Sequence, residues 1–123
     1  MSKVVTRFPP SPTGSLHIGN VRTAIFNYLF ARHVGGEFIV RVEDTDKERS
    51  RREYEEDMLA SIAWLGLERD NKTIVRQSER TAVYNKYLQT LVDKDLAYLS
   101  QEIEGANREV VRFRNPNKIV IFQ

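Results

Sequence analysis

Hydrophobic and polar positions in the first 42 residues predict a strand, a helix and a second strand. Residues 4–8 form a short, largely apolar run that ends in a proline-rich stretch, as a buried strand followed by a loop does. An apolar stripe at helical spacing then runs to Gly35 and Gly36 through Val21, Ala24, Ile25, Tyr28 and Leu29. Residues 38–42 are almost continuously apolar, which is typical of a parallel strand covered on both faces. Together the segments predict a right-handed βαβ unit.

A second helix is predicted before Gly66. The patterns Thr45-x-x-Glu48 and Ser50-x-x-Glu53 both fit the capping box that begins many helices. The buried stripe of this helix is Tyr54, Met58, Ile62 and Leu65.

The rest of the chain predicts one more helix and then β structure. Residues 73–76 suit a short extended segment, and Ser78 can cap a third helix that ends near Asp93. Residues 97–99, 110–113 and 119–122 favour strands, with turn-like residues at 104–107 and 115–117. The last run has no turn, cap or polar tail after it, so we expect either a piece of a longer protein or a natural edge strand.

Composition limits the classes of protein that fit. With 123 residues and 14.3 kDa, the chain has room for one modest core. The 41% hydrophobic and 29% charged residues exclude intrinsic disorder and collagen-like order. The absence of Cys excludes disulfides, Cys-ligated zinc, iron–sulfur clusters and thiol catalysis. No apolar run approaches the ~18 residues of a membrane span, and no secretory pattern opens the chain, so we expect a cytoplasmic protein.

Net charge adds little, because a formal +2 is too weak to indicate nucleic acid. Only residues 108–118 carry a clear excess of positive charge. Their basic residues are Arg108, Arg112, Arg114 and Lys118, and their acidic residue is Glu109. This segment either faces phosphate or is a solvated edge.

The most informative stretch is residues 7–20, between the first strand and the first helix. Ligands of open α/β sheets bind at this end of the strands, and a helix N-terminus attracts phosphate. We expect Gly14 to permit a tight turn and Gly19 to let a base or ribose lie on the backbone. His17 can direct an imidazole N–H to an α-phosphate, which is worth about 10²- to 10³-fold in rate. Alternatively, His17 is a helix-start residue whose ring a backbone carbonyl satisfies.

A second candidate group follows the second predicted strand. Glu43 shares a strand face with Ile39 and Arg41 and can hold a ligand ammonium, while Arg7 can pair with a ligand carboxylate. We expect Arg7, His17 and Glu43 around one hollow; the alternative for Arg7 and Glu43 is a mutual salt bridge. Asp44 and Asp46 favour helix capping over metal binding.

Several motifs together resemble bacterial glutamyl-tRNA synthetases. They are residues 7–14 (RFPPSPTG), 16–19 (LHIG), 41–46 (RVEDTD), 64–67 (WLGL) and 76–80 (RQSER). The resemblance implies the N-terminal half of a Rossmann-like class I catalytic domain over residues 1–98. Residues 99–123 would begin a β-rich insertion that binds the tRNA acceptor stem. It also implies activation of glutamate with ATP and transfer to the 3′ end of tRNA by a full-length enzyme that is a monomer.

The site residues are carried over position by position. The resemblance assigns catalysis to His17 and glutamate binding to Arg7, Ser11 and Glu43. Arg49, Arg112 and Arg114 are assigned to tRNA. The ATP-binding positions are Pro10, Ser11, Thr13, Gly14, His17, Ile18, Gly19 and Asn20. Mg²⁺ is expected to arrive with ATP, and no metal site is expected in the protein itself.

Some positions depart from the family pattern. Pro9 stands where alanine is usual, and the segment 99–110 is short and lacks the family's cysteines, so no zinc site is expected. Nothing matches the Lys-Met-Ser-Lys-Ser-type loop that grips the β- and γ-phosphates, or the anticodon-binding region. We therefore expect weak ATP binding and little or no aminoacylation by this chain alone.

Four other functions remain as alternatives. A glutaminyl-tRNA synthetase typically continues its opening motif with Glu-Pro-Asn-Gly, unlike residues 11–14 here. The paralogue that glutamylates a tRNA base usually keeps a cysteine zinc site. A small nucleotidyltransferase also uses His-x-Gly at a helix start. The last alternative is a non-catalytic tRNA-binding fragment.

Overall fold

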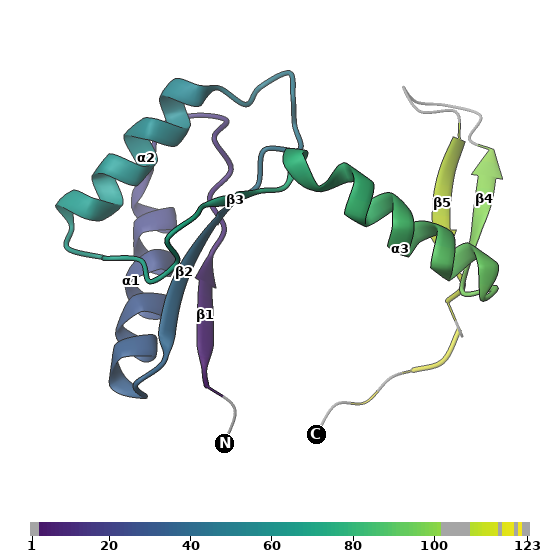
Figure 1. The fold of residues 1–123 in the computed structure, drawn as a ribbon, viewed down its shortest axis with the longest axis horizontal. Coiled ribbons are helices and arrows are strands. Elements are labelled where there is room, and N and C mark those ends of the chain that lie inside the picture. The colour runs from purple at the N-terminus through teal and green to yellow at the C-terminus, as the bar shows by residue number, and fades with distance from the viewer. Residues whose placement is uncertain (1–2, 102–108, 116, 120, 122–123) are drawn as a thin grey trace. The chain divides into compact units, whose positions relative to one another are not determined.

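The predicted βαβ unit is present in the computed structural model, which describes residues 3–101, 109–115, 117–119 and 121 (Figure 1). Strand β1 (Val5–Phe8) leads to helix α1 (Ile18–His33) and strand β2 (Glu37–Val42). Helix α2 (Arg52–Trp64) and the short strand β3 (Val75–Arg76) follow. The strands are parallel in the order β1-β2-β3, which confirms the predicted α/β class with a parallel sheet.

One face of this sheet carries the core. Phe8, Phe38 and Val40 pack with Ala24 and Ala31 of α1, Ile62 of α2 and Leu67, and all of them are buried. Residues of β2 alternate between buried and half-buried. The prediction of a strand covered on both faces is therefore wrong for the described residues, because α1 and α2 contribute to the same core cluster. The face of Ile39 and Arg41 stays partly exposed.

Helix α1 differs from its prediction in one respect. Ala24 is buried and Ile25 and Tyr28 pack against the core, as the stripe predicts. Leu29, however, is 58% exposed, and Phe26 and Phe30 are also exposed, at 62% and 54%. Apolar residues thus occur on both sides of α1, and spacing alone could not tell which side faces the sheet.

Helix α2 begins without either predicted capping box. Its N-cap is Arg51, which makes no side-chain cap hydrogen bond, and residues 47–49 form a turn. The Arg51 N–H donates to the carbonyl of Pro12 at 2.9 Å, so the preceding loop fixes the helix start. The Ser50 hydroxyl is buried and has no hydrogen-bond partner in the described ranges. The predicted end at Gly66 is confirmed by its φ of 73°, although Leu65 is 36% exposed.

The side chains of Asp70 and Asn71 bind backbone groups of β2 that β3 does not pair with. Asp70 Oδ2 accepts from the N–H of Phe38 at 2.7 Å. Asn71 accepts from the N–H of Val40 at 2.9 Å and donates to its carbonyl at 3.0 Å. These side chains satisfy backbone groups that a longer third strand would otherwise pair.

The chain divides into two compact units, Met1–Arg80 and Thr81–Gln123, which are described separately. The 3₁₀ helix η1 (Ser78–Arg80) ends the first unit. In the second unit, helix α3 (Thr81–Asp93) precedes the antiparallel strands β4 (Ala97–Gln101) and β5 (Glu109–Phe113). The unit boundary reflects packing of α3 with β4; the predicted functional division after residue 98 stays a prediction.

The last predicted β segment is not a strand where it can be described. Ile119 and Ile121 lie outside strands, while residues 120 and 122 and the predicted turn at 104–107 lie outside the described residues. Strand structure requires a hydrogen-bonded partner, and the two described sheets include none for these positions. Among the described residues, no helix combines the length and apolarity needed to cross a membrane.

Candidate active site

The loops that follow β1 and β2 meet at the carboxyl ends of the two strands. Phe8 lies beside Val40 in the parallel register, so both strands end at the same edge of the sheet. The N–H of Glu43 donates to the carbonyl of Pro10 at 2.9 Å. The first loop is therefore tied to the loop after β2 at Pro10 and to the start of α2 at Pro12.

A hollow of about 340 Å³ lies against the first loop and the start of α1. Among the predicted ATP-binding residues, six line it: Pro10, Ser11, Thr13, Gly14, His17 and Asn20. Ile18 and Gly19 are not in its lining; Ile18 is the first residue of α1 and its side chain is 82% exposed.

His17 is the N-cap of α1. Its Nδ1 accepts a hydrogen bond from the N–H of Gly19 at 3.2 Å. This confirms the helix-start role of the alternative interpretation, but with a backbone N–H as partner where a carbonyl was expected. Because Nδ1 is the acceptor, the neutral ring carries its proton on Nε2. The same ring thus caps the helix and offers one N–H donor.

The surroundings and backbone of the two loop glycines differ from the predictions. A Cβ on Gly19 would lie 3.0 Å from Cε1 of His17 and 3.1 Å from its Nδ1, so the space beside Gly19 holds the imidazole. A Cβ on Gly14 would meet nothing within 4 Å. Gly14 is also not among the positive-φ residues, so the predicted turn requirement is not seen.

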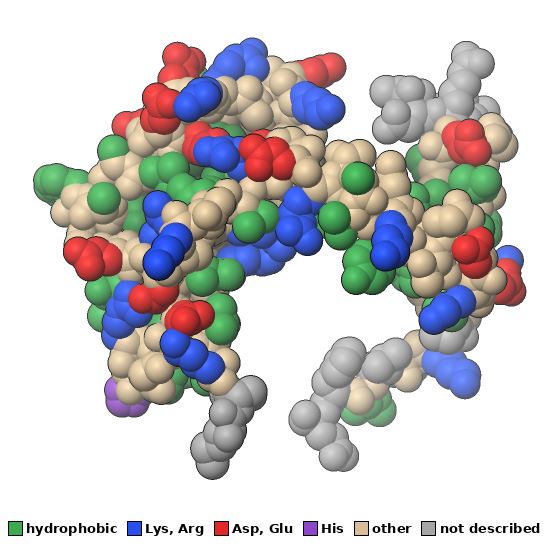
Figure 2. Space-filling model, in the orientation of Figure 1, with side chains coloured by type: hydrophobic (Ala, Val, Ile, Leu, Met, Phe, Trp, Pro, Cys, Tyr) green, Lys and Arg blue, Asp and Glu red, His purple; other side chains and the backbone are tan. Residues whose placement is uncertain are grey.

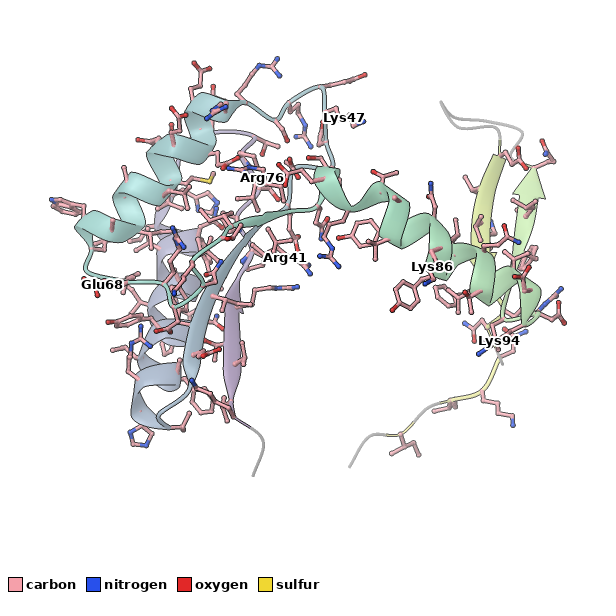
Figure 3. All side chains as sticks on the ribbon, in the orientation of Figure 1. Arg41, Lys47, Glu68, Arg76, Lys86 and Lys94 are labelled. Carbon is pink, nitrogen blue, oxygen red and sulfur yellow. The ribbon has the colours of Figure 1, made fainter. Side chains whose placement is uncertain are left out.

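Arg7, Arg41, Glu43 and Gln77 gather on the partly exposed face of the sheet (Arg41 is labelled in Figure 3). Arg7 pairs with Ile39 across the strands, which places it on the face of Arg41 and Glu43. Glu43 Oε1 lies 2.8 Å from Arg41 Nη2 and 3.8 Å from Arg7 Nη2. Gln77 Nε2 donates to the same oxygen at 3.3 Å.

The structure brings Arg7 and Glu43 together, as both the clamp and the salt-bridge interpretations require. Neither of them lines the hollow of Ser11 and His17. The expectation of one hollow around Arg7, His17 and Glu43 is therefore wrong in this structure. The alternating side chains of β1 and β2 place Arg7 and Glu43 on the sheet face, and the hydrogen bond from Glu43 N–H to Pro10 joins this group to the loop.

Sequence analysis did not select Arg41 or Gln77. An arginine within an apolar strand, two residues before a candidate acid, was a usable signal for Arg41. Gln77 follows β3, 34 residues from Glu43, and only the pairing of β2 with β3 brings it near.

The two Asp residues accept backbone N–H donors but do not cap α2, whose N-cap is Arg51, so the capping prediction is wrong for that helix. Asp44 accepts from the N–H of Ser78 at 2.9 Å and from its hydroxyl at 2.5 Å. Burial opposes ionisation of Asp44, but these hydrogen bonds outweigh it and lower the pKa of its carboxyl. Asp46 accepts from the N–H of Arg49 at 3.1 Å. The described ranges contain no group of three metal-ligating side chains.

The arginines predicted to contact tRNA lie in both units. Arg49 pairs with Asp46 at 2.6 Å and its side chain is 73% exposed. Arg112 lies opposite Tyr98 in the β4–β5 ladder. Arg114 pairs with Asp95 at 2.7 Å and lies over the Tyr98 ring, 5.1 Å from its centre. On the face of the first unit shown in Figure 2, acidic and basic side chains are interspersed.

Candidate residues at the carboxyl ends of parallel strands are typical of α/β proteins that bind ligands. Comparison with known proteins identifies the family within this class. The family described as "tRNA synthetases class I (E and Q), catalytic domain" matches residues 3–116. The chain therefore belongs to the class I tRNA synthetases of the glutamate and glutamine type.

Individual relatives agree with this assignment. A glutamate–tRNA ligase of Oleidesulfovibrio alaskensis is 54% identical over 117 residues, covering 93% of this chain and 25% of the relative. The ligase of Aquifex aeolicus is 48% identical, covering 96% of this chain and 26% of the relative. The chain thus spans about a quarter of the length of these curated relatives.

Solved structures lead to the same family. A crystal structure of a glutamate tRNA ligase from Elizabethkingia meningosepticum "in complex with its amino acid" superposes with a TM-score of 0.77. It is 44% identical, covering 82% of this chain and 22% of that one. The resemblance to glutamyl-tRNA synthetases predicted from the motifs is confirmed.

Proposed function

We propose that this chain supplies the first half of the catalytic domain of a glutamate–tRNA ligase. In that reaction, a glutamate carboxylate attacks the α-phosphate of ATP, pyrophosphate leaves, and the glutamyl group of the adenylate is transferred to the 3′ end of tRNA. The observation that carries the proposal is the Arg7–Glu43 pair beside a loop that His17 closes, in a member of this family. The names of the relatives favour glutamate over glutamine.

The sheet-face group suits a dicarboxylic amino acid. Arg7 is 43% exposed and 3.8 Å from Glu43, beyond hydrogen-bond distance, so its guanidinium can turn to a ligand carboxylate. Glu43 would hold the ammonium group, and Ser11, exposed on the adjoining loop, would bind a carboxylate. A similar glutamate tRNA ligase was crystallised in complex with its amino acid, which supports an amino-acid site in this family.

ATP, as its Mg²⁺ complex, would occupy the loop hollow. Pro10, Ser11, Thr13, Gly14 and Asn20 line the hollow, and Ile18 and Gly19 begin the helix whose free N–H groups attract phosphate. The Nε2–H of His17 would stabilise charge that develops on the α-phosphate during displacement, without transferring a proton. The proline-rich loop holds these groups in place before the ligand arrives.

Residues 99–123 would begin the part that binds the tRNA acceptor stem. Arg112 and Arg114, together with Arg49, would contact phosphates. We further propose a cytoplasmic enzyme that is a monomer at full length. Membership in the synthetase family removes the nucleotidyltransferase alternative, while a tRNA gel-shift separates a catalytic role from tRNA binding alone.

Titration of the ¹⁵N-labelled chain with L-glutamate, followed by NMR, tests the proposal. We expect saturable shifts in the loops after β1 and β2, and about 10-fold or greater weakening in Arg7→Gln, because a hydrogen-bonded ion pair with the ligand is lost. Arg52→Gln is the matched control, since Arg52 is 88% exposed and pairs only with Glu56 within the described part. Absence of saturable binding, or equal weakening in the control, overturns the proposal.

A further inference from the structure

The Glu43 carboxylate is held through one of its two oxygens. Oε1 takes the contacts from Arg41 Nη2 at 2.8 Å, Gln77 Nε2 at 3.3 Å and Arg7 Nη2 at 3.8 Å. Within the described residues, no hydrogen bond to Oε2 is found, and the Glu43 side chain is 30% exposed. One oxygen is therefore fixed by the protein while the other is left for a ligand.

Gln77 is itself firmly placed. Its backbone N–H donates to the carbonyl of Val42 at 3.0 Å. The next residue, Ser78, donates its N–H and its hydroxyl to the two carboxylate oxygens of Asp44. Because Asp44 follows Glu43 directly, these bonds lock the Gln77 segment against the loop that carries Glu43.

Arg41 carries an unmet hydrogen-bonding group. Its Nη2 binds Glu43, but its Nε is buried without a hydrogen-bond partner in the described part of the chain. A buried, unpaired N–H is unfavourable for folding, so Arg41 is not placed there by optimal hydrogen bonding alone. The Arg41 side chain as a whole is 29% exposed, so part of it remains open to solvent.

The charges of this group also favour a role in recognition. Arg7 and Arg41 against Glu43 leave one positive charge, which complements a glutamate zwitterion with two carboxylates and one ammonium. Without Arg41, the Arg7–Glu43 pair would be neutral, and its members would be free to close on each other. Arg41 competes with Arg7 for Oε1, because its Nη2 lies 2.8 Å from this oxygen and Arg7 Nη2 lies 3.8 Å from it.

We propose that Arg41 and Gln77 are positioning residues for amino-acid recognition. They hold Glu43 Oε1, so that Oε2 accepts from the ligand ammonium and Arg7 stays available for a ligand carboxylate. This inference rests on the proposed glutamate-binding function and adds to it the two residues that orient the ammonium acceptor.

The experiment compares L-glutamate with glutarate, which has the same two carboxylates and no ammonium. Kd values for both ligands are measured by NMR titration, and the readout is the ratio of the glutarate Kd to the L-glutamate Kd. We expect this ratio to fall about tenfold in Arg41→Lys, because lysine lacks the planar guanidinium that fixes Oε1, and about threefold in Gln77→Met, because a hydrogen bond to Oε1 is lost. Arg41→Lys keeps the positive charge, so carboxylate attraction is retained.

Matched controls repeat each substitution elsewhere. Arg52→Lys lies on the exposed start of α2, and Gln89→Met removes a Gln–Asp hydrogen bond on α3. Neither control should change the ratio. In a Glu43→Gln background, Arg41→Lys and Gln77→Met should have no further effect, since both act through Glu43.

The outcomes separate this inference from the proposed function. If the unsubstituted chain does not bind L-glutamate, both are overturned. If it binds L-glutamate but the ratio is unchanged in Arg41→Lys and Gln77→Met, only the positioning role is overturned. Effects that persist in the Glu43→Gln background also overturn it. So does an unfolded circular dichroism spectrum of both variants, because positioning residues act on the ligand and not on the fold.

Discussion

The His17 ring has an observed structural role and a proposed chemical role. Nδ1 closes the first turn of α1 through Gly19, and Nε2–H remains for a ligand. The closeness of Gly19 to the imidazole explains why a residue without a Cβ stands there. Helix capping and the proposed phosphate recognition therefore involve the same native side chain, and substitutions of His17 can separate them.

Replacing His17 by Asn and by Ala separates the two tasks. His17→Ala should lower the free energy of unfolding by about 1 kcal/mol, the usual effect of losing an N-cap. His17→Asn should remain within about 0.5 kcal/mol of the native value, because Asn caps well. Both should weaken ATP binding, since neither reproduces the imidazole donor. Urea unfolding and ATP titration measure the two effects; unimpaired ATP binding in both variants would contradict the donor role.

The lowered pKa of Asp44 predicts how the stability of the fold depends on pH. Its hydrogen bonds from Ser78 lower its pKa in the folded state. Near and below the ordinary Asp pKa, the unfolded chain therefore binds more protons than the folded chain. The contribution of Asp44 to the free energy of unfolding is full above that pKa and is lost as the pH falls through the lowered pKa of the folded state.

Asp44→Asn should consequently flatten the acid side of the stability profile and lower stability at pH 7 by about 1 kcal/mol, through weaker hydrogen bonds. Urea unfolding from pH 7 to pH 3 measures both quantities. The exposed Asp57 provides the control Asp57→Asn. A profile for Asp44→Asn that keeps the native slope would show that Asp44 contributes no linkage.

At the scale of elements, α2 is joined to β3 by a nearly buried ion pair. Glu55 is 9% exposed, and its carboxylate accepts from Nε and Nη2 of Arg76 at distances of 2.6 to 3.1 Å. This two-pronged contact fixes the segment that leads into Gln77. The Glu55 carboxylate also raises the pKa of Arg76.

Removing one partner should be costly because it leaves the other charge without compensation. We expect Arg76→Gln to lower the free energy of unfolding by about 2 kcal/mol, a figure reduced from the usual range because Arg76 is 35% exposed. The double variant Glu55→Gln/Arg76→Gln should lose less than the sum of the single losses. Additive losses in urea unfolding would contradict this coupling.

Sequence patterns predicted most elements but not how their ends are held. The strand over 4–8, the helix stripe at Ala24 and Tyr28, and the strand over 38–42 follow from local spacing. The start of α2 did not, because the carbonyl of Pro12 binds Arg51 and replaces the Ser50 cap. Likewise, Arg7 and Glu43 were identified from their types and strand ends, whereas Gln77 depends on strand pairing that no local pattern encodes.

At the scale of the whole molecule, the core is confined to one unit. The buried cluster lies within the first unit, while α3 contains no buried residue. Among the described residues of the second unit, Ala97 is the buried apolar side chain. The prediction of one modest core is therefore confirmed for the described part, and stability should be unequal along the chain.

Hydrogen exchange should reveal this difference. Backbone amides of α3 should exchange at least about tenfold faster than those of α1, because opening α3 exposes little buried apolar surface. Mass spectrometry of deuterated peptides measures both helices in one sample, so α1 serves as the internal reference. Equal protection of the two helices would show that α3 is stabilised by contacts that its burial does not indicate.

The side chains of Asp70 and Asn71 have a consequence for how copies of the protein behave at high concentration. By occupying the N–H groups of Phe38 and Val40, they leave this edge of the sheet with few groups to offer an incoming strand. Strand-to-strand association, the usual beginning of β-rich aggregates, is therefore blocked at that edge by an acid and an amide. The two polar side chains that satisfy backbone groups of β2 should therefore also reduce aggregation through this edge.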